Sequence, residues 1–282
     1  MHYDVSAWIT NAVYELYMQA LQSLRHINEH RRAYEVVFNI VHYGVVRAFL
    51  TDPELSRDAR FIKFLGVADN FLKKIFEIYD KYRANVSNIA RNVFDGVLHL
   101  LKHIKGFRLV VFCDSMSLVE ALYIAYKMRA GFINVVINPG GVTETYKFLL
   151  GAEEYMARQP RLEEIVSAIA RRAGASHVIF RDYDEAVHMF ESSEGVEPQL
   201  IVDEMYSATL RLEAALSRLK REGATVVLLS DHGYDIVPLT PGKFKTLHRW
   251  SPRSLSVIAP VLIIDPHNSN LVSGCQVASL GV

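Results

Sequence analysis

Cysteine is scarce in this chain: its 282 residues include only Cys113 and Cys275. Two cysteines are too few for the disulfide framework of a small secreted domain, and Cys113 lies in an apolar stretch that suits a reduced thiol. No uninterrupted apolar run reaches the length needed to cross a membrane. The first residues, Met-His-Tyr-Asp, lack the basic and apolar regions of a signal peptide. We therefore expect a cytoplasmic protein with no membrane partner.

An excess of charge of either sign is also missing. Lys plus Arg number 31 and Asp plus Glu number 31, so the formal net charge is zero. This balance removes the global basic field that attracts nucleic acid and leaves only local patches for that purpose. Hydrophobic residues make up 50% of the chain and charged residues 22%, which is typical of globular proteins. The length allows one large α/β domain or two smaller ones.

The first 105 residues have the three- and four-residue apolar spacing of helices. Each set of apolar residues makes one stripe along a helix. The sets run from Ile9 to Leu24, from Val36 to Val45, from Phe71 to Tyr79 and from Ile89 to Ile104. We predict an N-terminal helical region of about four helices over residues 1–105. Two roles fit such a region: covering an active site, or binding a second copy of the chain or a partner protein.

From residue 106 onward, apolar runs alternate with helical spacing. This alternation predicts an α/β domain over 106–265, with a doubly wound, mostly parallel sheet. Pro260 predicts that the last strand is an edge strand or carries a bulge. The small and polar residues 266–282 predict a loose tail. Strands are expected over 108–114, 132–138, 176–181, 225–230 and 255–265, and helices around 117–129, 143–157, 161–172 and 200–221.

Acidic and histidine side chains follow several of the predicted strands. Open α/β sheets place their chemistry at the carboxyl ends of their strands. Asp114 ends the first strand, and Asp231-His232-Gly233 ends the apolar run Thr225–Ser230. Asp184 and His188 follow the third strand at a four-residue spacing, which places both on one face if the segment is helical. His248 comes just before the last strand.

Each of these elements also has a simpler structural interpretation. Asp114 could cap the next helix, Asp184 and His188 could lie in a solvated loop, and His248 could be a surface histidine. Taken together, however, several carboxylates at one sheet edge would repel each other unless cations were bound there. Carboxylate and imidazole ligands suit zinc, with manganese as the alternative. The set therefore predicts two divalent metal ions, which form a clamp suited to phosphoryl transfer.

A nucleophile is expected after the second strand, in the segment Asn138-Pro139-Gly140-Gly141-Val142-Thr143-Glu144. The two glycines allow a tight backbone path, and Thr143 would then open a helix, where N–H groups and the helix dipole favour an anion. A metal would be needed to activate the threonine hydroxyl. The simpler interpretation is that Thr143 is an ordinary N-cap, and the two roles are compatible. Ser115 and Thr145 are weaker nucleophile candidates.

This ordered set of residues resembles the alkaline phosphatase superfamily, and most closely its PglZ-domain branch. The family pattern is a strand-end Asp, a Ser or Thr nucleophile that opens a helix, Asp-x-x-x-His, Asp-His and a final His. The chain matches it over roughly residues 107–265, including the stretch after His248 that leads into a Pro-containing strand. Two positions depart from the pattern: Ser115 stands where Gly is common, and Arg249-Trp250 stand where two glycines are common.

The resemblance implies an alkaline-phosphatase-like fold and a role for each matched residue. One metal would be held by Asp184, His188 and His248, and the other by Asp114, Asp231 and His232, with Thr143 as the bridging nucleophile. The implied activity is that of a metal-dependent phosphohydrolase, either a phosphodiesterase or a phosphomonoesterase. Its substrate would be a phosphate ester, with nucleotides and oligonucleotides as candidates.

Basic residues surround His248 in the sequence and suggest a substrate-binding role for Arg249 and Lys245, near Lys243 and Arg253. A solvated basic loop is the simpler interpretation of this cluster. A non-catalytic scaffold of the same fold, binding a partner protein through its N-terminal helices, is the alternative to the enzyme. Phosphosugar mutases of the superfamily are not expected, because the short gaps between the motifs leave no room for their inserted domain.

Overall fold

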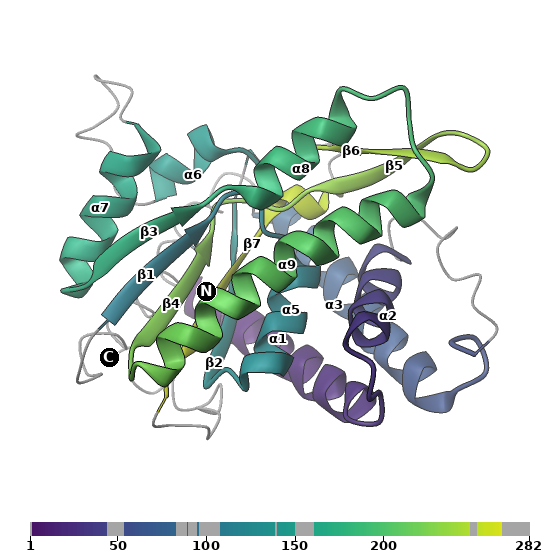
Figure 1. The fold of residues 1–282 in the computed structure, drawn as a ribbon, viewed down its shortest axis with the longest axis horizontal. Helices are drawn as coiled ribbons and strands as arrows, with labels where there is room; N and C mark the ends of the chain where they lie inside the picture. The colour runs from purple at the N-terminus through teal and green to yellow at the C-terminus, as the bar shows by residue number, and fades with distance from the viewer. Residues whose placement is uncertain are drawn as a thin grey trace.

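A five-stranded mixed sheet forms the centre of the molecule in this computed structural model (Figure 1). The structure describes residues 2–43, 54–82, 89, 95, 108–138, 140–149, 161–248 and 253–266. Most of the predicted helix between Ile89 and Ile104, and nearly all of the predicted tail over 266–282, lie outside the described residues.

The strand order is β2-β7-β4-β1-β3. The strands are β1 (Arg108–Cys113), β2 (Phe132–Ile137), β3 (Ser176–Phe180), β4 (Thr225–Ser230) and β7 (Ile258–Ile264). β1 pairs in parallel with both β3 and β4, whereas β7 pairs antiparallel with both β4 and β2. The chain therefore has an α/β fold, as predicted, and β7 is the strand of this sheet that runs against the other four.

The prediction that Pro260 marks an edge strand or a bulge is wrong. β7 lies between β2 and β4, and its register with each neighbour is continuous. Pairing with β4 ends at Leu229↔Val261, so Pro260 lies just beyond that ladder. A proline lacks the N–H needed to extend a ladder. Its position at the end of one ladder explains how an inner strand accommodates it.

Helices cover both faces of the sheet (Figure 1). α1 (His2–Leu24), α2 (His30–Tyr43) and α3 (Ala59–Lys81) confirm the three predicted N-terminal helices that fall on described residues. The remaining helices are α5 (Leu118–Met128), α6 (Thr143–Leu149), α7 (Leu162–Ala173), α8 (Asp182–Glu191), α9 (Pro198–Arg221) and the short 3₁₀ helix η4 (Leu255–Val257). α6 and α7 lie on one side of the sheet, while α1, α5 and α9 lie on the other.

Alternate strand residues point into two separate hydrophobic cores. Along β1, Val110 and Phe112 pack in the core shared with α6 and α7, whereas Val111 and Cys113 pack in the larger core. This is the two-residue period of a strand buried on both faces. The larger core is continuous with the apolar faces of α1, α2 and α3. The N-terminal helices are therefore packed onto the α/β part through a shared interior.

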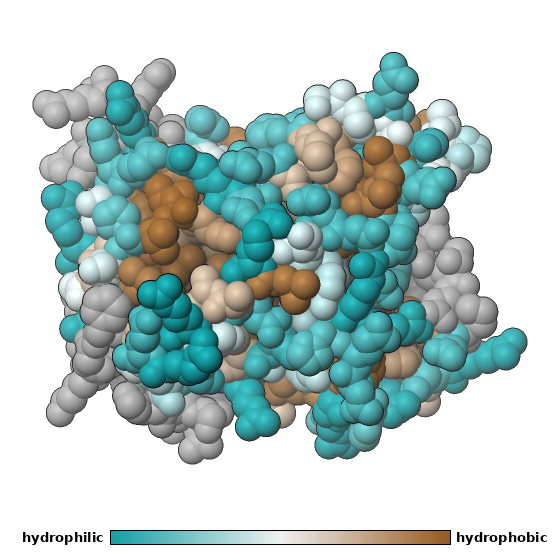
Figure 2. Space-filling model, viewed as in Figure 1, coloured by the Kyte–Doolittle hydropathy of each residue, from teal (hydrophilic) through white to brown (hydrophobic). Residues whose placement is uncertain are grey.

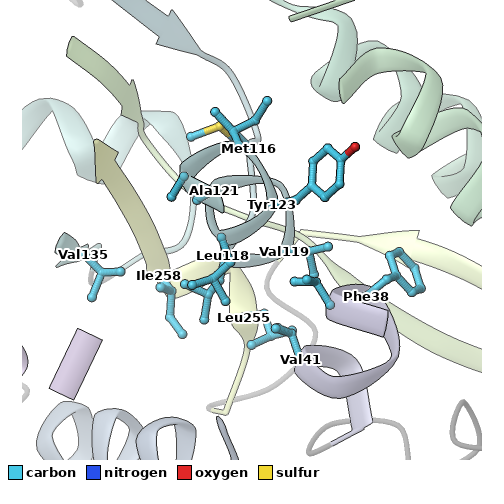
Figure 3. Packing of buried hydrophobic residues seen from close by; sticks show 14 of the residues in the cluster. Phe38, Val41, Met116, Leu118, Val119, Ala121, Tyr123, Val135, Leu255 and Ile258 are labelled. Carbon is cyan, nitrogen blue, oxygen red and sulfur yellow. The ribbon is translucent and has the colours of Figure 1, made fainter. Parts of the chain in front are cut away.

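α5 lies in the middle of the larger core (Figure 3). Every residue of this helix except Tyr126 and Lys127 is buried. Leu118 and Val119 lie between residues of α2, such as Val41, and the strand residue Ile258. Because α5 starts four residues after Asp114, its burial fixes the position of the segment that carries this aspartate.

A buried carboxylate joins three parts of the chain behind the strand ends. Glu120 is fully buried and accepts hydrogen bonds from the hydroxyls of Tyr34, at 2.8 Å, and Tyr234, at 2.9 Å. Ser117 caps α5 and donates to the same carboxylate from its backbone N–H and its hydroxyl. Four donors satisfy a group that would be costly to bury alone. They link α2, α5 and the chain just after Gly233.

Replacing Tyr34 with phenylalanine is expected to lower the free energy of unfolding by about 1.5–3 kcal/mol, because the buried side chain of Glu120 loses one of its four donors. Tyr17→Phe is the matched control, because the Tyr17 hydroxyl also joins an N-terminal helix to α5 but donates to the neutral carbonyl of Ala125 at 2.8 Å. Its loss should cost about 0.5–1.5 kcal/mol. Urea denaturation measures both losses, and equal losses would contradict the larger contribution expected of the Tyr34–Glu120 hydrogen bond.

Sequence periodicity did not reveal the two-stranded sheet formed by β5 (Asp235–Thr240) and β6 (Lys243–Leu247). Pro238 and Pro241 argue against strands in this segment. The hairpin is held by α8 and its following turn: Thr246 donates to the carbonyl of Val187 at 2.6 Å, and Phe244 pairs with Val196. β6 therefore returns the chain towards α8 immediately before His248.

The face of the molecule shown in Figure 2 is largely hydrophilic, and its hydrophobic areas are separate patches. The helices that the structure describes include none with the length and apolar character required to cross a membrane.

Candidate metal centre

The predicted ligand residues meet at one edge of the sheet. β1, β3 and β4 are parallel, so Asp114, the start of α8 and Asp231 all follow the carboxyl ends of their strands. β7 runs in the opposite direction and therefore begins at this edge, with His248 shortly before it. The topology explains how residues more than a hundred positions apart in sequence can share a site.

Asp114, Asp231 and His232 form a buried group, called here the inner triad. One ligand atom from each lies within 4.8 Å of the others. His232 Nε2 is 3.3 Å from Asp231 Oδ2 and 3.9 Å from Asp114 Oδ1. The Asp231 side chain is fully buried. Two carboxylates and an imidazole at this spacing match the ligand set of a divalent cation.

Asp184, His188 and His248 form a second group, the outer triad, whose ligand atoms also lie within 4.8 Å of one another. α8 is helical, so Asp184 and His188 share a face, with 3.4 Å between Asp184 Oδ1 and His188 Nε2. His248 Nε2 is 3.9 Å from the same carboxylate oxygen. The His188 side chain is 58% exposed, so this triad opens to solvent.

The two triads are adjacent. The His248 ring lies 4.8 Å from the His232 ring of the inner triad and 5.2 Å from the His188 ring, measured between centroids. Ser115 lies between the triads: its N–H donates to Asp231 Oδ1 at 3.3 Å and its hydroxyl to Asp184 Oδ1 at 3.0 Å. The six predicted ligand residues therefore form one continuous site with two compartments.

Several buried polar atoms of this site have no hydrogen-bond partner among the described residues. Within the described part of the chain, Asp114 Oδ1 and both ring nitrogens of His248 are buried and make no hydrogen bond. Buried polar atoms are normally paired, and exceptions call for a specific explanation. The unpaired atoms belong to residues of both triads. Their chemistry therefore fits two divalent ions, with zinc and manganese both compatible with an oxygen and nitrogen donor set.

The orientation of two histidines strengthens this fit. His232 Nδ1 is 3.0 Å from the carbonyl of Gly233, which can only accept, so Nδ1 carries the proton of the neutral ring. The lone pair on Nε2 then faces the carboxylates of Asp114 and Asp231. His188 Nδ1 is likewise 2.9 Å from Glu191 Oε2, which leaves Nε2 towards Asp184. Metal-binding histidines are commonly oriented by such partners.

Burial and like charge shift the pKa values at the site. Burial, followed by the charges of Asp231 and Asp184, raises the pKa of Asp114 to about 7. Burial also raises the pKa of Asp231 to about 6, against the lowering effect of the Thr143 hydrogen bond. Burial lowers the pKa of His232, and it lowers the pKa of His248 to about 4. The site therefore disfavours carboxylate charge, which a bound cation would compensate.

Thr143 is the first residue of α6 and lies against the inner triad. Its hydroxyl donates to Asp231 Oδ2 at 2.7 Å and is 3.4 Å from His232 Nε2. The preceding turn closes between Asn138 and Gly141, whose φ of 62° is accessible to glycine without strain. Asn138 is buried and donates to the carbonyls of Asp231 and Val142, so it ties this turn to the inner triad.

The two weaker nucleophile candidates lie differently. Thr145 turns its hydroxyl towards Asn138 Oδ1, at 2.6 Å, and the carbonyl of Val142, at 2.9 Å. Ser115 is fully buried, and its hydroxyl donates to Asp184. Among the three hydroxyls, that of Thr143 is the one that contacts a residue pair of the inner triad.

Two residues of the site were not anticipated as partners of the ligands. The sequence predicts Ser115 as a weaker nucleophile candidate and as a departure from the family pattern, but not as a donor to the ligand residues, because these contacts depend on how separate strands converge. Glu191 follows His188 at a three-residue spacing on α8, a signal that the sequence does carry. Ser117, rather than Asp114, caps α5.

Of the predicted substrate-binding residues, Lys245 lies half-buried on β6 opposite Val237, and Arg249 lies outside the described residues.

No protein-family model matches the chain, and comparison with curated proteins finds no relative.

Proposed function

We propose that the protein is a metal-dependent phosphohydrolase that uses Thr143 as its nucleophile. The observation that carries the proposal is the hydrogen bond of 2.7 Å from the Thr143 hydroxyl to Asp231 Oδ2, inside a triad of metal-ligand type. A hydroxyl next to a pair of such triads is the arrangement expected for phosphoryl transfer. The order of these residues along the chain supports an alkaline-phosphatase-like, PglZ-like fold.

The inner triad would hold one ion through Asp114, Asp231 and His232, and the outer triad a second through Asp184, His188 and His248. When bound, zinc or manganese would supply positive charge that lowers the pKa of the Thr143 hydroxyl and offsets the charge of the transferred phosphoryl group. The protein provides orientation: the Gly233 carbonyl fixes the His232 ring, the Glu191 carboxylate fixes the His188 ring, and the Asn138 side chain fixes the turn before Thr143.

The reaction proceeds in two displacements. Thr143 Oγ would attack phosphorus as the bond to the leaving oxygen breaks, and the hydroxyl proton would pass through water to that oxygen, so that the Asp231 carboxylate stays available to hold the ion. This gives phosphothreonine and the alcohol. Water would then attack phosphorus as the bond to Thr143 Oγ breaks, one water proton would return to Thr143 Oγ, and phosphate or a phosphate monoester would be released. The sum is hydrolysis of one phosphate ester bond.

Phosphate monoesters and diesters both fit this chemistry, and nucleotides or oligonucleotides are the substrates we propose to test first. The outer triad is the open side of the site, since the Asp184 side chain is 26% exposed whereas that of Asp231 is fully buried. The substrate would therefore approach past α8. Lys245 and Arg249 remain candidates for binding its non-reacting part.

Removing metal is expected to abolish hydrolysis, and adding zinc or manganese is expected to restore it. Protein dialysed against a chelator would be assayed with p-nitrophenyl phosphate, bis(p-nitrophenyl) phosphate and a short oligonucleotide, before and after each ion is added. Supporting results are hydrolysis of at least one ester that depends on the ion. Hydrolysis that persists in chelator, or none with any ester and ion, would contradict the proposal and favour a non-catalytic scaffold.

A further inference from the structure

Ser115 donates hydrogen bonds to both triads. Its backbone N–H donates to Asp231 Oδ1 of the inner triad, and its hydroxyl donates to Asp184 Oδ1 of the outer triad. Asp184 Oδ1 is also the oxygen nearest to both outer histidines, 3.4 Å from His188 Nε2 and 3.9 Å from His248 Nε2. The serine therefore holds the particular oxygen around which the outer triad is arranged.

The backbone of Ser115 is held in an unfavourable conformation to make these contacts. Its φ of 65° lies in the left-handed region, which disfavours residues with a Cβ and favours glycine. The side chain is fully buried between the end of β1 and the buried start of α5. Strain of this kind persists only where the surroundings determine it, and it concentrates at functional sites.

Asp184 depends on this contact more than Asp231 does. Asp231 is also hydrogen-bonded by Thr143 and by the N–H of His232, so it has other supports. Asp184 lies on α8, on the solvent-open side, and its side chain is 26% exposed. A carboxylate that ligates metal binds more tightly when a hydrogen-bond donor fixes its orientation.

We propose that Ser115 is a positioning residue that aligns Asp184 for the outer metal and couples the two metal sites. The inference rests on the proposed function, because it concerns the same pair of ions. Binding in the inner triad would fix Asp231, which holds the Ser115 N–H, and the Ser115 hydroxyl would then present Asp184 in the orientation that the second ion needs. Coupling of this kind is reciprocal between the two ions.

Two variants distinguish the effect of the Ser115 hydroxyl from that of its backbone conformation. Ser115→Gly keeps the N–H, removes the hydroxyl and relieves the left-handed strain, whereas Ser115→Ala keeps the strain. Both are expected to weaken the affinity for the second ion by about 10–100-fold, the effect of losing a supporting contact to a ligand. The affinity for the first ion should change by less than about threefold. The glycine variant should be at least as stable as the alanine variant. Ser23→Ala is the matched control, since Ser23 is a fully buried serine whose hydroxyl links α1 to α3.

Calorimetric titration of the metal-free proteins with zinc, and separately with manganese, measures both affinities. The inference predicts a weakened second ion in both Ser115 variants and unchanged binding in Ser23→Ala. Equal affinities in all four proteins, or equal weakening of both ions, would overturn it while leaving the proposed function in place. A wild-type protein that binds fewer than two ions would overturn the proposed function and this inference together.

Discussion

Thr143→Ala is expected to lower the turnover number at least about 1000-fold, the scale on which losing a catalytic nucleophile acts in hydrolases. The physical reason is that the variant removes the hydroxyl that donates to Asp231 Oδ2 and would form the bond to phosphorus. Metal content should be largely unchanged, because the six proposed ligand residues remain. Steady-state hydrolysis of the best ester, with metal analysis of the same sample, measures both effects.

Thr143→Ser is the matched control, because it restores a hydroxyl at the same position. We expect it to retain turnover within about tenfold of the wild type and to form a phosphoenzyme that mass spectrometry detects as one added phosphate on residue 143. Undiminished turnover in Thr143→Ala would reject the nucleophile assignment. Phosphate found on Ser115 would move that role to the other hydroxyl at the site.

Asp114→Asn is expected to have opposite effects on the stability of the metal-free and the metal-loaded protein. The pKa of Asp114 is raised from 3.8 to about 7, so the folded state holds this proton more tightly than the unfolded state does. Stability from this group is therefore lost as the pH rises between these two values. Above pH 7 the neutral asparagine avoids the cost of a buried charge, which should stabilise the metal-free protein by roughly 1–3 kcal/mol.

Excess metal reverses the order of stability. Zinc at about 1,000 times its dissociation constant should stabilise the wild type by about 4.1 kcal/mol per ion, and Asp114→Asn should lose most of the contribution of the inner ion. Urea denaturation at pH 7.5, with chelator and with zinc, measures both. Comparing the two proteins at the same pH cancels the opposite contribution of His248, whose lowered pKa costs stability as the pH falls.

Asp58→Asn is the matched comparison, because the pKa of Asp58 is lowered whereas that of Asp114 is raised. The Arg60 side chain lowers the pKa of Asp58 to about 2, so this carboxylate stabilises the folded state when it is charged. Its replacement should reduce stability in chelator and leave the response to zinc unchanged. If Asp114→Asn also destabilised the metal-free protein, the raised pKa and the idea of a site poised for a cation would be wrong.

Strands and helices could be predicted from the sequence where apolar residues form a short continuous run or recur at helical spacing. The apolar runs that became β1, β2 and β4 are buried on both faces, and the predicted boundaries lie within a residue of those observed. The position of β7 in the sheet was predicted wrongly, because a proline was expected to exclude its strand from the interior of a sheet. The ladder with β4 ends at Val261, so Pro260 is not required to donate a hydrogen bond to β4. The β5–β6 hairpin was missed because Pro238 and Pro241 conceal its pairing.

Part of the candidate site could also be predicted from the sequence. The convergence of the six predicted ligand residues follows from strand ends that meet at one edge and from the helical spacing of Asp184 and His188, whereas their division into two triads is what the family resemblance implies. The bridging contacts of Ser115 could not be predicted, because they depend on a positive φ and on distances between elements far apart in sequence. The fit of the Glu120 carboxylate among two tyrosines depends on tertiary packing in the same way.

Metal stoichiometry tests the central claim most directly. Elemental analysis would be made on wild-type protein and on a variant carrying both Asp231→Ala and His232→Ala, after incubation with zinc or manganese and removal of unbound ions. We expect about two ions per wild-type chain, one for each triad, and at most one in the variant, which keeps only the outer triad. A wild-type chain without bound metal, or a variant with the same content as the wild type, would contradict it.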